Sequence, residues 1–173
     1  MKKLILHFQK YQKMKRWEFL WKISLEFTLL SVLLIPILIF ILKFIPGLAF
    51  LFDTESIDEK ISWVSFIYIV LLVPILETLI FQAFPIFIAR LFKAAIKWQI
   101  LVSMLFFMSI HLLGNSILSG ILAGSIGGFY LAFIYSHWRN KSRWDAFEMT
   151  VAAHFFHNLV LAFLWFLEPF INI

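Results

Sequence analysis

The sequence predicts an all-α protein: a bundle of about five transmembrane helices, preceded by an amphipathic helix on the membrane surface. Hydrophobic residues make up 62% of the 173 residues and charged residues only 14%, and the mean hydropathy is +0.93. A soluble chain of this length could not bury so much apolar surface. The apolar stretches also lack the alternation of a membrane barrel, and a bilayer allows only helices or closed barrels to cross it.

Five apolar stretches are separated by short polar connections, and a helical crossing needs ~20 such residues. The stretches cover residues 23–44, 61–89, 100–113, 117–137 and 149–170. The third is short, so we expect it either to reach the far surface or to break within the membrane. Three prolines, Pro36, Pro74 and Pro85, are expected to kink their helices, because proline lacks the backbone N–H and clashes with the preceding turn. Residues 23–173 therefore form one transmembrane domain.

Residues 1–22 combine basic side chains with aromatic and aliphatic ones at three- and four-residue steps, among them Phe8, Tyr11, Trp17 and Trp21. This pattern predicts an amphipathic leader helix that lies on the lipid bilayer. Aromatic anchors beside a span are explained by the membrane interface, so a nucleic-acid partner is not expected. The first apolar stretch is too long for a signal-peptide core and is expected to be retained as a span.

The basic residues indicate the topology, because cytoplasmic connections are enriched in Lys and Arg. They gather in residues 1–22, 90–97 and 139–143, whereas residues 53–59 are acidic. Five crossings with a cytoplasmic N-terminus and an external C-terminus place every basic connection inside. We therefore expect a multi-pass protein of the cell membrane in this orientation.

Two features of the composition limit the chemistry. The chain has no Cys, which excludes disulfides, thiol nucleophiles and Cys-ligated zinc. Gly120, Gly124 and Gly128 form overlapping G-x-x-x-G steps, which are typical of close helix packing in membranes. Ser125 lies nearby but lacks the G-x-S-x-G frame of a serine nucleophile.

Ionisable residues at membrane depth are costly and are candidates for function. Glu26 and Lys43 lie at the ends of the first stretch, within reach of the interface, and are set aside. Glu77 lies in the second stretch, His111 in the third, and His154 with Asn158 in the fifth. At ~1.5 Å rise per residue from the cytoplasmic ends, Glu77 and His111 lie roughly 20 Å deep and His154 about 15 Å deep.

The fifth stretch presents its polar residues on two faces. His154 and Asn158 are four residues apart and share one helix face, whereas His157 points elsewhere and is expected to be structural. A carboxylate, two imidazoles and an amide at matching depth suit a general base with oxyanion donors. Any one of these residues alone would also suit interhelical hydrogen bonding.

These residues stand in motifs that resemble the CAAX protease and bacteriocin-processing (CPBP or Abi) family of membrane-embedded proteases. The family motifs are E-E-x-x-x-R, F-x-x-x-H and H-x-x-x-N or H-x-x-x-D, in this order on successive core helices. Here Glu77 begins E-T-L-I-F-Q, Phe107 and His111 bound F-M-S-I-H, and His154 and Asn158 bound H-F-F-H-N. The second and third motifs match fully, and the resemblance covers a catalytic core of about residues 61–164.

The first motif departs from the family pattern, with Thr78 in place of the second glutamate and Gln82 in place of the arginine. The two positions are four apart on a helix, so we expect a neutral Thr–Gln hydrogen bond in place of a Glu–Arg ion pair. Replacing both partners avoids an uncompensated buried charge, which indicates a retained architecture.

The resemblance implies an intramembrane endopeptidase that hydrolyses a peptide bond of a membrane-associated protein or peptide. Glu77 would activate a water that His111 also holds, and His154 and Asn158 would stabilise the oxyanion. The residues in supporting positions would be Thr78, Gln82 and Phe107.

No cofactor is expected, because glutamate-activated water accounts for these residues. Zinc held by Glu77, His111 and His154 is the alternative, although the H-E-x-x-H pattern is missing. Two other functions stay open at this point: a non-catalytic membrane adaptor that retains the family fold, and a small transporter component that uses the same residues as a proton relay.

The topology can be tested by single-cysteine labelling, because the chain has no Cys of its own. We expect Asp58→Cys to react with a membrane-impermeant maleimide in intact cells, and Lys141→Cys to react only after permeabilisation. The cysteine-free parent is the control. The reverse pattern would contradict the proposed orientation.

Overall fold

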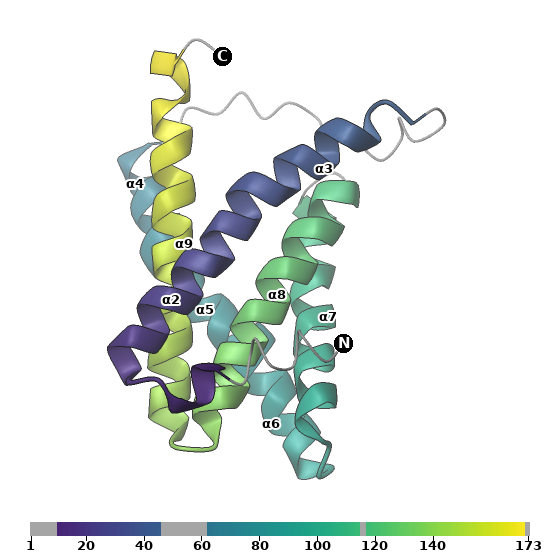
Figure 1. Cartoon of the computed structure of the whole chain (residues 1–173), viewed down its shortest axis with the longest axis vertical. Coiled ribbons are helices and arrows are strands. Elements are labelled where there is room, and N and C mark those ends of the chain that lie inside the picture. Colours follow the sequence, from purple (N-terminus) through teal and green to yellow (C-terminus); the bar gives the residue numbers. More distant parts are fainter. Residues whose placement is uncertain (1–9, 46–61, 115–116, 172–173) are drawn as a thin grey trace.

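The computed structural model describes residues 10–45, 62–114 and 117–171, and in these residues it is a helical bundle without strands (Figure 1). Two helical rods are interrupted by wider π-helical turns, one in the rod Arg16–Leu42 and two in the rod Trp63–Leu91. The elements are the 3₁₀ turn η1 (Lys10–Lys13), α2 (Arg16–Leu29), π-helix η2 (Leu30–Leu34), α3 (Ile35–Leu42), α4 (Trp63–Ile67), π-helix η4 (Tyr68–Leu72), α5 (Val73–Glu77), π-helix η5 (Thr78–Ala83), α6 (Phe84–Leu91), α7 (Ile96–Gly114), α8 (Ile117–Arg139) and α9 (Arg143–Ile171).

Four helical rods among the described residues are long and apolar enough to cross a membrane: Arg16–Leu42, Trp63–Leu91, Ile96–Leu113 and Arg143–Leu167. This confirms the predicted all-α membrane bundle. The third predicted stretch is longer than its apolar run suggested, because α7 already begins at Ile96. The fourth predicted stretch corresponds to α8, which is not among these four rods. Its 23 residues span about 34 Å at the helical rise, so it stays a predicted crossing.

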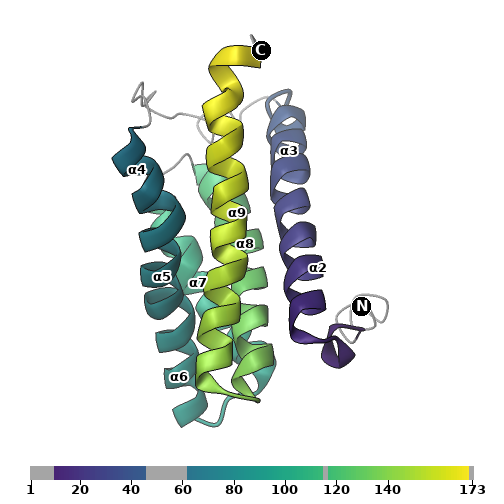
Figure 2. The same cartoon turned by 90° about the vertical axis from the view of Figure 1, so that its left-hand side faces the viewer.

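The basic ends of the helices lie together at one end of the bundle. There α2 and α9 begin and α6 and α8 end, while the C-terminal end of α9 lies at the opposite end (Figure 2). This arrangement agrees with the alternation of crossings. Which end faces the cytoplasm stays a prediction.

Each of the three prolines expected to kink a helix follows directly on a π-helical segment. Pro36, Pro74 and Pro85 are each the second residue of the α-helix that follows η2, η4 or η5. Proline has no N–H to donate to the preceding turn, and π-helical turns accommodate such interruptions. The α-helical hydrogen-bond pattern is therefore interrupted at all three positions.

The closest helix pair is α7 with α8, and glycine makes it possible. A Cβ atom added at Gly124 would lie 2.7 Å from Met108 Cα, and one at Gly120 would lie 2.7 Å from the His111 carbonyl oxygen. Contacts of that length with backbone leave no room for a side chain. This confirms the close packing predicted from the G-x-x-x-G steps.

The N-terminal part of the chain is anchored in the bundle. Residues 16–22 of the predicted leader continue into the first span as α2, and residues 1–9 lie outside the described residues. Arg16 pairs with Asp145 at 3.2 Å and with Glu148, which ties the start of α2 to the start of α9. Phe19 and Ile23 are fully buried in the core.

Glu26 was set aside as a residue within reach of the interface, and the structure places its partly exposed carboxylate in a polar cluster. Its carboxylate accepts hydrogen bonds from the Tyr11 hydroxyl at 2.5 Å and the Tyr130 hydroxyl at 2.7 Å. Burial, together with the Glu26 carboxylate, raises the pKa of Tyr11. A polar cluster therefore joins η1, α2 and α8, because a partly buried carboxylate needs such partners.

The glycine contact generates a stability prediction. Gly124→Ala places a methyl group against the Met108 backbone, so we expect a loss of about 1–3 kcal/mol in unfolding free energy, as overpacking typically costs. Gly127→Ala is the matched control, because its added Cβ meets a side-chain atom of Phe107 at 3.1 Å rather than backbone. Thermal unfolding in detergent should show a larger fall in Tm for Gly124→Ala, and equal falls would contradict the packing account.

Candidate active site

A cavity of about 600 Å³ opens between the α2–α3 rod and the helices α7, α8 and α9. Its polar lining is grouped on α7 and α9, and the opposite wall on α2 and α3 is mainly apolar. The lining residues are Phe27, Ser31, Val32, Ile35, Pro36, Phe107, His111, Ala123, Gly127, His154, His157, Asn158, Leu161 and Leu164. Three of the four residues predicted as catalytic, all but Glu77, thus line one cavity.

Glu77 does not line this cavity itself but contacts His154, which does. It is the last residue of α5, and its Oε2 lies 3.5 Å from Nε2 of His154 on α9. The His154 ring is 4% exposed and the Glu77 side chain 21%. The distance is longer than an ordinary hydrogen bond. The Glu77 carboxylate therefore contacts a side chain that lines the cavity.

Phe107 packs against both candidate imidazoles. Its ring centroid lies 4.4 Å from that of His111 and 5.9 Å from that of His154. Nδ1 of His111 lies 3.0 Å from the Phe107 carbonyl oxygen. A carbonyl can only accept, so Nδ1 carries the proton, and Nε2 is the acceptor of the neutral ring.

Asn158 is held by a backbone carbonyl of the second span. Its Nδ2 donates to the Ile69 carbonyl oxygen at 3.0 Å. In π-helix η4 that carbonyl would accept from the residue five positions later, which is Pro74 and has no N–H. Pro74 thus frees an acceptor that Asn158 satisfies. The proline was visible in the sequence, but the π-helical register that selects Ile69 was not.

The predicted hydrogen bond between Thr78 and Gln82 is wrong. Both side chains are fully buried, yet Thr78 Oγ1, Gln82 Oε1 and Gln82 Nε2 have no hydrogen-bond partner within the described part of the chain. Both residues belong to π-helix η5, whose wider turn changes the relation between positions four apart.

His157 faces α2, as its offset from the shared face of His154 and Asn158 predicted. Its Nδ1 lies 3.4 Å from Thr28 Oγ1, and its ring stacks on Phe27 with centroids 4.0 Å apart. The ring also lines the cavity. Its direct partners are therefore on α2 and do not include Glu77.

Within residues 10–45, 62–114 and 117–171, no three side chains of His, Cys, Asp or Glu are placed to hold a metal ion. Glu77 and His154 come together, but His111 does not complete a ligand set with them. The residues of the zinc alternative thus do not form a metal site in this arrangement.

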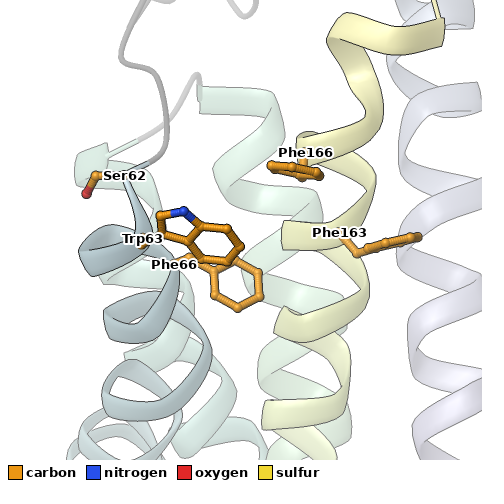
Figure 3. Close-up of a pocket in the computed structure, with 5 residues that line it drawn as sticks. All are labelled: Ser62, Trp63, Phe66, Phe163 and Phe166. Carbon is orange, nitrogen blue, oxygen red and sulfur yellow. The ribbon is translucent and has the colours of Figure 1, made fainter.

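A smaller crevice of about 250 Å³ lies between α4 and α9 (Figure 3). Apart from Ser62, which caps α4 by accepting from the Ser65 N–H at 3.0 Å, its lining is aromatic. The aromatic residues are Trp63, Phe66, Phe163 and Phe166. No ionisable side chain lines it, so it offers no acid–base chemistry.

Comparison with known protein families finds a match, and it covers the helices that carry the candidate catalytic residues. The family model described as Rce1-like, type II CAAX prenyl endopeptidase Rce1-like, matches residues 59–160. The match includes all four candidate catalytic residues. No curated protein and no solved structure matches the chain.

The two buried positions in the altered first motif generate a double-mutant prediction. Thr78→Glu inserts an unpaired carboxylate at a fully buried position, so we expect a loss of about 3–5 kcal/mol in unfolding free energy. Adding Gln82→Arg should recover much of that loss through an ion pair. Unfolding of both single variants and the double variant in detergent measures the coupling, and simple additivity would contradict a paired arrangement at these positions.

Proposed function

The chain belongs to the Rce1-like family of type II CAAX prenyl endopeptidases, and we propose that it is an intramembrane endopeptidase in which Glu77 activates the attacking water. The observation that carries this proposal is the contact between the Glu77 carboxylate and the His154 imidazole, 3.5 Å apart, beside a cavity that His111 and Asn158 also line. The family match supports neither an adaptor nor a transporter.

The cavity suits a peptide that enters from the membrane. Val32, Ile35 and Pro36 form an apolar wall opposite the polar side chains of α7 and α9. Such a wall accepts apolar substrate side chains, while a few convergent polar groups orient the scissile bond. The substrate class is therefore a membrane-associated protein or peptide.

The first chemical step is the attack of water on the scissile carbonyl. Glu77 accepts a proton from the water, whose oxygen then bonds to the carbonyl carbon, and the acceptor Nε2 of His111 holds and orients the water. Neither the Thr78 hydroxyl nor the Gln82 amide forms a hydrogen bond within the described residues. The departures in the first motif therefore do not act on Glu77 through a direct hydrogen bond, which is compatible with activity.

The second step is stabilisation and collapse of the tetrahedral intermediate. The Asn158 amide has two N–H groups, and its bond to the Ile69 carbonyl leaves one to donate to the oxyanion together with His154. The C–N bond then breaks, and Glu77 returns its proton to the leaving amine. The bond to Ile69 orients the amide before substrate binds. Preorganised donors stabilise an oxyanion most strongly, because they need not reorient during the reaction.

This proposal predicts the effect of removing each group on cleavage by the purified chain in liposomes. Glu77→Gln removes the base, and His111→Ala and His154→Ala remove the groups that hold water and oxyanion, so all three variants should lose detectable cleavage. Asn158→Ala should lower kcat by roughly 100- to 1,000-fold, as expected for one oxyanion donor.

The matched control is His157→Phe, which keeps an aromatic ring against Phe27 but removes the nitrogen near Thr28. It should cleave like the parent chain and unfold at a similar temperature. Parent-like cleavage by Glu77→Gln would end the enzymatic assignment, and loss of cleavage in His157→Phe would contradict the division of roles between His154 and His157.

A further inference from the structure

A groove of about 310 Å³ lies at the end of the bundle where α6 and α8 end and α9 begins, separate from the cavity and the crevice described above. Its apolar part is formed by Leu79, Ala83, Phe84 and Phe87 of η5 and α6. Leu79 is 53% exposed, Phe84 56% and Phe87 45%. This part of the groove thus lies open on the outer surface of a membrane helix, apart from the candidate active site.

The mouth of the groove is basic. Arg139 and Arg143 line it, and the charges of Arg90 and Arg143 both act on Arg139 and repel it. Arg90 donates to Asn140 Oδ1 at 3.3 Å, which holds it beside the turn after α8. Arginines from three helices, Arg90 of α6, Arg139 of α8 and Arg143 of α9, therefore form a basic cluster at the mouth of the groove.

No ion pair neutralises these three arginines within the part of the chain that the structure describes. The nearby acids Asp145 and Glu148 pair with Arg16 instead. Guanidinium groups match phosphate oxygens in bidentate geometry. The charge at the mouth of the groove is therefore suited to bind an anionic ligand.

The groove also has the length of one leaflet. Leu79 and Arg90 lie on one continuous rod, and at the helical rise their separation is about 16–17 Å, close to half of the ~30 Å hydrocarbon core. A ligand with an anionic head at the arginines and an acyl chain along Leu79, Phe84 and Phe87 would fill it. We propose that this groove binds an anionic phospholipid of the adjacent leaflet, with its phosphate on Arg139 and Arg143. A lipid is favoured over a peptide carboxylate because the apolar lining faces the bilayer.

The test uses the full chain in phosphatidylcholine nanodiscs, with spin-labelled phosphatidylglycerol or phosphatidylcholine as the probe. The immobilised fraction of each probe measures lipid binding. We expect the parent chain to prefer phosphatidylglycerol by roughly tenfold, since each basic group near an anionic headgroup contributes to binding. Arg139→Gln with Arg143→Gln should lose nearly all of this preference.

The matched control is Lys93→Gln with Lys97→Gln, which removes the same charge from the α6–α7 turn and the first turn of α7, outside the groove, and it should keep most of the preference. Arg139→Lys with Arg143→Lys keeps the charge without the bidentate geometry and should fall between the parent and the Gln pair. If circular dichroism shows that the Gln pair does not fold, the lipid preference of this Lys pair tests the proposal.

Four results would overturn the proposal. These are the absence of a preference in the parent chain, an equal loss in the Lys93 and Lys97 control, no fall in the Lys pair, and displacement of the labelled lipid by inorganic phosphate or by a short peptide with a free carboxylate. Displacement by phosphate would indicate a site for the anion alone. Displacement by the peptide would assign the groove to a polypeptide.

Discussion

A carboxylate inside the hydrocarbon of a bilayer costs several kcal/mol unless a neighbouring group compensates it. The polar group that lies beside the Glu77 carboxylate is the imidazole of His154, 3.5 Å away. The contact requires α5 and α9 to lie side by side, as they do (Figure 2). His154 then presents its ring to the cavity that His111 and Asn158 line. The placement of the second span against the last one and the arrangement of the candidate site thus depend on the same interaction.

The irregular backbone of the second span is the next constraint. A bilayer supplies no water to a carbonyl that has lost its helical partner, so a neighbouring helix must supply a donor. Asn158 does this for Ile69, five residues before Pro74, at 3.0 Å. Ser103 of α7 also donates to a carbonyl of the second span, that of Phe81 in π-helix η5, at 2.7 Å. Side chains of α7 and α9 are thus hydrogen-bonded to carbonyls of the second span, and the bond next to Pro74 orients the Asn158 amide.

The bundle and the order of the motifs could be predicted from the sequence, because hydropathy along the chain dominates the placement of membrane helices. The family match over residues 59–160 confirms the resemblance that the motifs indicated. The missing Thr78–Gln82 bond could not be foreseen, since the π-helical turn that holds both residues leaves no pattern in the sequence. The partners of Glu26 could not be foreseen either, because Tyr11 and Tyr130 lie 15 and 104 residues away and only tertiary packing brings them together.

The central claim is that Glu77 and His154 face each other while His157 faces α2, and cross-linking measures this most directly in a chain without native Cys. A short bifunctional thiol reagent should join Glu77→Cys to His154→Cys in isolated membranes nearly completely. It should not join Glu77→Cys to His157→Cys. Equal cross-linking of the two pairs, or cross-linking of only the His157 pair, would contradict the account.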